Sequence, residues 1–301
     1  MTKIVTTGVA VVDFVFFLDE MPRLAEKYRA QGAEITGGGG AANAAAAIAR
    51  LGGHAMPASR LGSDQVADMI AAGLETDGVD CAMLKRFEGR RSSFSSVFID
   101  KHGERQIVNF RDHELPMDAG WLQAVLPDDF DAALADTRWP DGAEVLMRTA
   151  RERGLPGVLD GEAPIREAEA ALNLASHVAF SAQGLRDWAE HDDFDKALAD
   201  VAVETGAFVC VTDGSKGVTW RHGTASGFEP SFAITPLDTL GAGDVWHGAF
   251  ALRLGEGASP PEAIRFASAV AAIKCTRTNG RAGYPTRAET ELFMKEAQSC
   301  S

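Results

Sequence analysis

Short apolar runs with β character alternate with alanine-rich helical stretches along most of this sequence. The clearest runs lie at residues 4–8, 157–160, 177–180 and 207–212, and a helix is predicted at residues 41–51. Apolar runs of about four to six residues between helices are typical of parallel strands that are covered on both faces. The pattern therefore predicts an α/β fold in three layers, α/β/α, in which ligands bind at the carboxyl ends of the strands.

Two parts of the chain interrupt this alternation and predict a second, smaller sheet. Residues 91–100 and 105–110 have the pattern of a β-hairpin whose turn contains a glycine, and residues 12–18 and 27–35 have similar β character. We expect these segments to form a lid from residues of about 12–35 and 91–112. The alternative is an antiparallel extension of the main sheet. Because no repeat or linker is evident, residues 1–301 are predicted to be a single domain.

The composition argues against several classes of function. The 301 residues carry a net charge of −14, which disfavours nucleic acid or an anionic membrane surface as a partner. There is no run of about 18 apolar residues, and the N-terminus lacks the profile of a signal peptide. The four cysteines have neither paired nor metal-like spacing; they are Cys81, Cys210, Cys275 and Cys300. We therefore expect a soluble, cytoplasmic protein that binds neither nucleic acid nor a membrane.

One segment near the C-terminus predicts an anion site beside a base. It reads Asp238-Thr239-Leu240-Gly241-Ala242-Gly243-Asp244 and runs directly into an apolar helical stretch. Its small residues would lie at a helix N-terminus, where free N–H groups and the helix dipole attract an anion and glycines allow close approach. Asp244 would then be placed to accept a proton from an attacking hydroxyl. A strand-to-helix turn with a capping aspartate is the alternative.

Two further glycine-rich segments offer backbone donors to a ligand. The first reads Gly37-Gly38-Gly39-Gly40-Ala41-Ala42-Asn43 and presents the Asn43 amide to a ligand hydroxyl, although a flexible loop with a capping asparagine would look the same. The second reads Val211-Thr212-Asp213-Gly214-Ser215-Lys216-Gly217 and could equally be a β-turn. It lacks the ending of a Walker A motif, and no G-x-G-x-x-G follows the first strand, so a dinucleotide site is not expected.

Taken in this order, the three segments resemble those of the ribokinase/PfkB family of sugar kinases, over essentially the full length of the chain. The resemblance implies a ribokinase-like core, a β-sheet lid that often mediates dimerisation, and a reaction that uses ATP and Mg²⁺. It makes Asp244 the catalytic base, with Gly241, Ala242 and Gly243 as the anion hole for the transferred phosphoryl group. It assigns the sugar to Asp13, Gly38, Gly39, Asn43 and Asp244, and the nucleotide to Thr212, Gly214, Ser215, Gly217, Gly241 and Gly243.

The metal requirements are less completely specified. An aspartate with an ordinary pKa of about 4 is ionised at neutral pH, and Mg²⁺ on ATP would offset the charge of the migrating group. The family often has an Asn-x-x-Glu segment that organises Mg²⁺ through water, but residues 180–185 here read Phe-Ser-Ala-Gln-Gly-Leu. No protein ligand for Mg²⁺ is therefore assigned, although Asp160 or Glu162 could contribute. Asp238 and the Leu240 backbone match positions that bind K⁺ in some relatives, which leaves monovalent-cation activation open.

Within the family, the chain looks most like the sulfofructose kinase branch. The matching stretches are residues 32–53, 91–109, 134–139, 158–161 and 266–285. This likeness implies that Lys27 and Asn109, from lid strands, and Arg138, from a core loop, hold a sulfonate when the lid closes. Two cations and an amide donor suit a monoanion with three acceptor oxygens. Taken singly, Lys27 could lie on a solvated face, and Arg138 could form a surface salt bridge with Asp136 or Asp141.

The expected activity is ATP-dependent phosphorylation of the 1-hydroxyl of 6-deoxy-6-sulfofructose, a sugar of sulfoquinovose catabolism. A kinase for a neutral ketose such as fructose, or for a sugar phosphate, is the alternative within this class. A catalytically silent protein that senses a sugar or a nucleotide is a different class. Such a protein would be expected to have lost the base, whereas Asp244 and all three anion-hole residues are present. A homodimer through the lid also follows from the resemblance, and the partner subunit could then supply substrate contacts.

Overall fold

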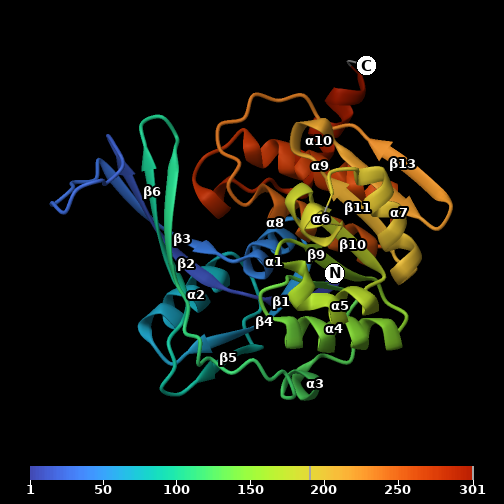
Figure 1. Ribbon diagram of the computed structural model, residues 1–301, viewed down its shortest axis with the longest axis horizontal. Coiled ribbons are helices and arrows are strands. Elements are labelled where there is room, and N and C mark those ends of the chain that lie inside the picture. The colour runs from blue at the N-terminus through green and yellow to red at the C-terminus, as the bar shows by residue number, and fades with distance from the viewer. Residues whose placement is uncertain (190, 300–301) are drawn as a thin grey trace.

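A nine-stranded sheet forms the centre of the computed structural model, which describes residues 1–189 and 191–299 (Figure 1). Neighbouring strands are parallel except at β12 and β13, and the order is β13-β12-β11-β10-β9-β8-β1-β4-β5. The strands are β1 (Lys3–Gly8), β4 (His54–Gly62), β5 (Leu84–Phe87), β8 (Ala132–Ala135), β9 (Gly157–Gly161), β10 (His177–Ser181), β11 (Phe208–Thr212), β12 (Val218–His222) and β13 (Ala225–Glu229). The predicted strands at 4–8, 157–160, 177–180 and 207–212 are confirmed as β1, β9, β10 and β11.

Helices cover both faces of this sheet, which confirms the predicted three layers. On one face lie α1 (Gly40–Arg50), α2 (Gln65–Thr76), α8 (Ala242–Gly255) and α9 (Pro260–Cys275). On the other lie α3 (Leu122–Val125), α4 (Pro140–Glu152), α5 (Glu169–Leu174), α6 (Ala182–Ala189) and α7 (Phe194–Thr205). The chain also forms α10 (Arg287–Ser299) and three short 3₁₀ turns, η1 (Ile165–Ala168), η2 (Gly214–Lys216) and η3 (Gly280–Gly283). None of the described helices is both long and apolar enough to cross a membrane.

The strands are continuously apolar because each one contributes to two cores. In β8, Ala132 and Leu134 belong to the buried cluster on one face, whereas Ala133 and Ala135 belong to the cluster on the other. A parallel strand that is buried on both faces has no position for a solvated side chain. The apolar runs in the sequence therefore indicate that helices cover both faces of the sheet, as well as where the strands lie.

A separate four-stranded sheet, drawn in blue and green in Figure 1, extends away from the main body. Its order is β3-β2-β6-β7, with β2 (Val11–Leu18), β3 (Gly32–Gly38), β6 (Phe94–Asp100) and β7 (Arg105–Phe110). The antiparallel pairing of β6 with β7 confirms the predicted hairpin. The alternative, an extension of the main sheet, is wrong because these strands pair only with one another.

The strand predicted at residues 27–35 is displaced along the chain. Gly32 pairs with Phe17, and β2 ends one residue later, so the residues before Gly32 have no partner strand. Residues 19–31 instead form an irregular connection, in which the Tyr28 hydroxyl accepts hydrogen bonds from backbone N–H groups. Lys27 is therefore exposed in this connection and does not lie on a strand, which corrects the prediction.

Helices α1 and α8 pack backbone to backbone beneath the carboxyl end of the main sheet. A Cβ atom at Gly248 would lie only 2.6 Å from the carbonyl oxygen of Ala44, so glycine permits the close approach. The first turns of the two helices carry Asn43 and Asp244. This contact is what brings two residues 201 positions apart in sequence within hydrogen-bonding distance.

Candidate active site

The N-terminus of α8 is formed by a left-handed glycine that follows a side-chain-capped turn. Gly241 occupies the N-cap with a φ of 72°, a conformation that glycine adopts without strain. Before it, Oδ1 of Asp238 accepts a hydrogen bond from the Leu240 N–H at 2.9 Å. The first N–H groups of α8 are not used within the helix. That of Ala242 donates to the carbonyl oxygen of Thr239 at 3.2 Å, and those that follow it can bind an anion.

Asp244, in the first turn of α8, accepts a hydrogen bond from Nδ2 of Asn43 at 2.7 Å. Burial raises the pKa of Asp244 above its ordinary value, although the Asn43 hydrogen bond and the charges of His247 and Arg281 oppose that rise. The sequence-based expectation of an ordinary pKa is therefore wrong, because the site is less solvated than a surface position. A raised pKa brings a carboxylate base closer to the operating pH, where proton transfer is more effective.

Both polar ends of the Asn43 side chain are engaged by protein groups. Its Oδ1 accepts a hydrogen bond from Nε of Arg281 at 3.0 Å, and Nη1 of Arg281 lies 3.2 Å from Asp77 Oδ2. A Cβ atom at Gly37 would lie 2.3 Å from Cζ of Arg281, so this glycine makes room for the guanidinium. In this geometry Asn43 orients the carboxylate of Asp244, and its predicted contact with a sugar hydroxyl stays a prediction. No sequence pattern singled out Arg281, because both of its partners are distant in sequence.

A cavity of about 260 Å³ lies between the small sheet and the carboxyl ends of the main strands. It brings together five of the residues predicted to bind the sugar, namely Asp13, Gly39, Asn109, Arg138 and Asp244. Gly38 lies behind this set: a Cβ atom there would be 2.3 Å from Oδ2 of Asp13. Lys27 and Asn43 do not line the cavity.

Ser95 links two of these residues across the small sheet. Nδ2 of Asn109 donates a hydrogen bond to Oγ of Ser95 at 3.1 Å, and Ser95 in turn hydrogen-bonds to Asp13, its register partner on β2. Burial raises the pKa of Asp13, while the Ser95 hydrogen bond and the charge of Arg281 lower it. Ser95 was missed because it lies in a run of serines in which neighbouring positions point to opposite faces of the strand.

Arg138 lines the cavity with its guanidinium directed toward Glu162, whose Oε2 lies 3.5 Å from Nη2. The alternative, a surface salt bridge to Asp136 or Asp141, has the wrong partner. The hydrogen bond between Arg138 and Asp136 is made by the backbone N–H of Arg138, at 2.8 Å, and not by its guanidinium. Arg111 also lines this cavity and was not predicted.

Asp136 is a buried carboxylate that joins three segments of the site. Besides Arg138, it accepts hydrogen bonds from the backbone N–H groups of Val9 at 3.0 Å and Ala41 at 3.1 Å. Burial raises its pKa, and these three hydrogen bonds counteract the rise. Its position directly after the apolar run at 132–135 was the available signal, since an acid at the carboxyl end of a parallel strand faces the ligand side of the sheet.

Asp160 and Glu162 provide carboxylates near Asp244. Oδ1 of Asp160 is buried without a hydrogen-bond partner, and burial raises the pKa of this group to about 7. His247 opposes the rise, with Nε2 3.5 Å from Oδ1, whereas the charges of Glu162 and Asp244 add to it. A buried oxygen without a partner suits a cation or its water shell. In the described part of the chain no three His, Cys, Asp or Glu residues cluster as a complete metal site.

A second, larger cavity of about 680 Å³ lies on the other side of the α8 N-terminus. It is lined by the four residues of the 211–217 segment that were predicted to bind the nucleotide, Thr212, Gly214, Ser215 and Gly217, together with Ala242 and Gly243. That segment is also a turn between antiparallel strands, β11 and β12, so both readings of it describe the same geometry. Because Asp244 lines the smaller cavity and Gly243 the larger, the two cavities meet at the predicted anion hole.

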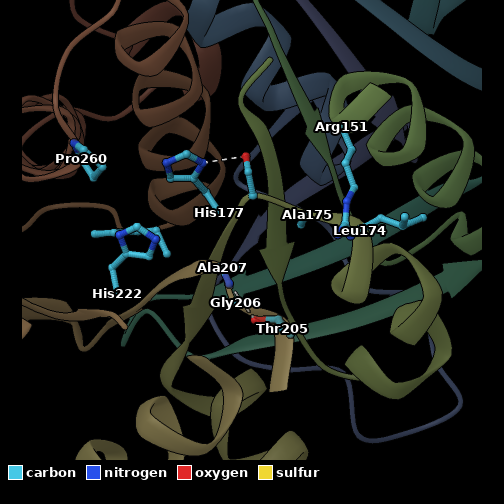
Figure 2. Close-up of a pocket in the computed structure, with 11 residues that line it drawn as sticks. Arg151, Leu174, Ala175, His177, Thr205, Gly206, Ala207, His222 and Pro260 are labelled. Carbon is cyan, nitrogen blue, oxygen red and sulfur yellow. Dashed lines mark hydrogen bonds between the residues drawn. The ribbon is translucent and has the colours of Figure 1, made fainter. Parts of the chain in front are cut away.

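A third cavity, of about 390 Å³, lies at the opposite end of the main sheet, by the amino ends of β10 and β11 (Figure 2). His177 and Phe208, the first residues of β10 and β11, line it together with Arg151 and His222. Figure 2 shows the hydrogen bond between the His177 ring and the Ser176 hydroxyl. None of the predicted site residues is here, which is consistent with the rule that ligands of parallel sheets bind at the carboxyl ends of strands.

Comparison with known proteins agrees with this architecture. Residues 1–287 match the model of the pfkB family carbohydrate kinases. The chain is 28% identical to a ribokinase of Haemophilus influenzae over 99% of its length and all of the relative, and 28% identical to a probable fructokinase-5 of Arabidopsis thaliana over 87% of this chain and 91% of the relative. A crystal structure of a putative ribokinase from Agrobacterium tumefaciens superposes with a TM-score of 0.91 at 33% identity, covering 99% of both chains.

The ribokinase-like fold, with two cavities that meet at a helix N-terminus, is that of an ATP-dependent carbohydrate kinase. This chain belongs to the pfkB family of carbohydrate kinases.

The buried carboxylate of Asp160 should make the stability of the free protein depend on pH. Its folded pKa of about 7 lies above the unfolded value of about 4, so its stabilising contribution is complete below pH 4 and is lost as the pH rises through 7. The free energy of unfolding of Asp160→Asn, relative to wild type, should therefore increase between about pH 4 and pH 7 and then level off. Denaturant titrations at several pH values measure this difference.

The matched control is Glu152→Gln, which removes an exposed carboxylate at the end of α4. A flat pH dependence for Asp160→Asn would contradict the raised pKa.

Proposed function

We propose that this kinase transfers the γ-phosphoryl group of ATP to the 1-hydroxyl of 6-deoxy-6-sulfofructose, with Asp244 as the general base. The observation that carries the proposal is the composition of the smaller cavity. The candidate base and the donors Arg138 and Asn109 line the same 260 Å³ space, so one sugar could reach both. A cationic fork and an amide match the three acceptor oxygens of a sulfonate.

Asp244 would accept the proton of the sugar hydroxyl as that oxygen attacks the γ-phosphorus. Asn43, hydrogen-bonded to Oδ2, holds the carboxylate in one orientation and leaves its other oxygen for the substrate. Because phosphoryl transfer needs in-line positioning more than covalent help from the protein, this orientation is a large part of what the residue contributes. The proton reaches Asp244 late, when the attacking oxygen has become acidic.

The first turn of α8 would receive the migrating phosphoryl group. The N–H groups near Gly241, Ala242 and Gly243 provide fixed dipoles that need no reorganisation during the reaction. The larger cavity would hold the nucleotide against η2, with its phosphates directed toward this helix end. Asp160 and Glu162 would hold, through water, the Mg²⁺ that accompanies ATP and neutralises phosphate charge.

The small sheet would act as the lid. Asp13 and Asn109 extend from it into the cavity, and Arg105 on β7 reaches across to Asp238 at 3.0 Å in the turn before α8. Sugar and phosphoryl group would therefore be enclosed by the same sheet, which excludes water during transfer.

A neutral ketose is the second candidate, and the likeness to a fructokinase favours it. The two candidates differ only in what faces Arg138 and Asn109. A panel of sulfonated, phosphorylated and neutral ketoses, assayed by ATP consumption, separates them. The sulfonate proposal requires the highest kcat/KM for sulfofructose.

Replacing Asp244 with asparagine should lower kcat by about 10²- to 10⁴-fold, because the proton of the attacking hydroxyl loses its acceptor. Binding of ATP, measured by calorimetry, should remain within a few-fold of wild type, since the nucleotide cavity is unchanged. Full turnover in Asp244→Asn would contradict the role of this residue as base, whichever sugar is used.

Replacing Arg138 with alanine should raise the KM for sulfofructose by about 10- to 100-fold, the range expected for loss of a hydrogen bond to a charged group. The kinetic constants for fructose should change much less. Arg148→Ala, which removes an exposed arginine of α4 paired with Glu144, is the control and should leave both sugars unaffected. An equal rise in KM for both sugars would mean that Arg138 supports the site without binding a sulfonate.

We further propose that two subunits pair through their lids. Phe14 pairs with Ile35 and Ser96, and Ser96 pairs with Val108, so these side chains form one row on the face opposite Asp13. Ile35 and Val108 are 62% and 60% exposed in the single chain, an arrangement typical of a surface that is buried by association. Lys27, exposed in the neighbouring connection, could then approach a sulfonate from the partner subunit.

Sedimentation velocity should give a dimer for the wild type and a monomer for Val108→Glu, because a carboxylate buried in an apolar interface is strongly unfavourable. Lys101→Glu, at the exposed tip of the β6–β7 turn, controls for the added negative charge on the same hairpin. A wild-type protein that stays monomeric at micromolar concentration would contradict the lid dimer.

A further inference from the structure

The ammonium group of Lys274 is buried against the turn that leads to the anion hole. Lys274 lies in the last turn of α9, and its side chain is 1% exposed. Its Nζ donates hydrogen bonds to the main-chain oxygen of Asp238 at 3.0 Å and to Oδ2 of the same residue at 2.9 Å. A buried ammonium is unfavourable unless it is paired and hydrogen-bonded, so a built interaction of this kind points to a specific use.

The two oxygens that Lys274 holds are those a monovalent cation would need at Asp238. Resemblance to the family left K⁺ open at this residue and the Leu240 backbone. However, Oδ2 and the carbonyl oxygen of Asp238 already accept hydrogen bonds from Lys274, and Oδ1 accepts from the Leu240 N–H and from Arg105. A K⁺ ion at these oxygens would have to displace a paired ammonium of equal charge. The residues present therefore do not fit K⁺.

We propose that Lys274 replaces the monovalent cation in this kinase and makes its activity independent of K⁺. The ammonium carries the same charge as K⁺ and is similar in size, and being part of the chain it is always present. It lies at the C-terminus of α9, where the helix dipole also favours a cation.

Lys274 acts on the anion hole through Asp238. Burial alone would raise the pKa of Asp238, but the hydrogen bonds from Leu240 and Lys274 and the charges of Lys274 and Arg105 together hold it below its ordinary value. The ionised carboxylate accepts the Leu240 N–H and so shapes the turn that ends at Gly241. Lys274 is accordingly a positioning residue that touches neither sugar nor nucleotide.

The backbone around this ion pair is docked on the same helix end. The N–H groups of Leu237 and Asp238 both donate to the carbonyl oxygen of Cys275, at 2.7 and 3.2 Å. Arg105, by contrast, comes from the small sheet, and its side chain is 34% exposed. The permanent part of the cation site is thus Lys274, and Arg105 is the part that depends on the position of the lid.

The first test compares wild-type enzyme in buffers of equal ionic strength that contain either K⁺ or tetramethylammonium. Initial rates, measured with whichever sugar of the ketose panel is turned over fastest, should agree within about twofold, and so should the midpoint of thermal unfolding. Because this choice of sugar does not presuppose sulfofructose, the result is independent of the substrate proposal. Activation of the wild type by K⁺ of several-fold or more would overturn the inference, and this holds even if no variant folds.

The second test uses two variants that differ in the space they leave. Lys274→Ala should lose at least about 10-fold in kcat in tetramethylammonium and regain much of it in K⁺ or NH₄⁺, with a thermal midpoint that rises with K⁺. Lys274→Met fills the same space without a charge, so the two ions should not restore it. Lys196→Ala, which removes an exposed lysine of α7, should behave as wild type in every buffer.

A merely structural lysine would give a different pattern. If folded Lys274→Ala loses activity and neither K⁺ nor NH₄⁺ restores any of it, Lys274 does not stand in for a cation. If Lys274→Ala keeps wild-type activity in tetramethylammonium, the charge at Asp238 is not needed, and the inference also fails.

Discussion

The hydrogen bonds of the buried Asp136 carboxylate hold together the segments around the smaller cavity. A buried carboxylate needs hydrogen-bond donors. Asp136 accepts hydrogen bonds from three backbone N–H groups, those of Val9, Ala41 and Arg138. Val9 precedes β2 of the small sheet, Ala41 lies at the start of α1, and Arg138 lies in the loop between β8 and α4. A Cβ atom at Gly8 would lie 2.1 Å from Cγ of Asp136, so β1 also has to end in glycine. One side chain thus connects the small sheet, helix α1 and the loop after β8.

Two buried carboxylates of the site are influenced by the same nearby guanidinium. Asp13 and Asp244 both have a raised pKa because they are buried, and the guanidinium of Arg281 lowers both. Arg281 is itself held between Asn43 and Asp77, and it reaches them only because Gly37 has no side chain. The carboxylate of Asp244 is therefore influenced by a cation that makes no contact with it. Such indirect control allows Asp244 to be oriented and kept partly desolvated without being neutralised by an ion pair.

Much of the architecture could be predicted because it follows from patterns of a few neighbouring residues. Continuous apolar runs predicted strands buried on both faces, and a glycine-rich segment before an apolar stretch predicted the start of α8 and the position of Asp244 in its first turn. The hairpin at β6 and β7 was predicted for the same reason. Lys27 was misplaced because the length of β3 is set by β2, which ends at Leu18 and offers no partner beyond it. The sequence neighbours of Asn43 do not reveal that both ends of its amide are engaged by Asp244 and Arg281.

The sequence by itself therefore determined the layers, the family likeness and the helix terminus that would bind a phosphoryl group, because periodicity and helix-start signals act over a few residues. The tertiary structure decided which charges meet. Arg281 lies 238 positions from Asn43, and Lys274 lies 36 positions from Asp238. Pairings of this kind depend on how helices α1, α8 and α9 pack on one face of the sheet, and a buried charge is stable only where that packing provides its partner.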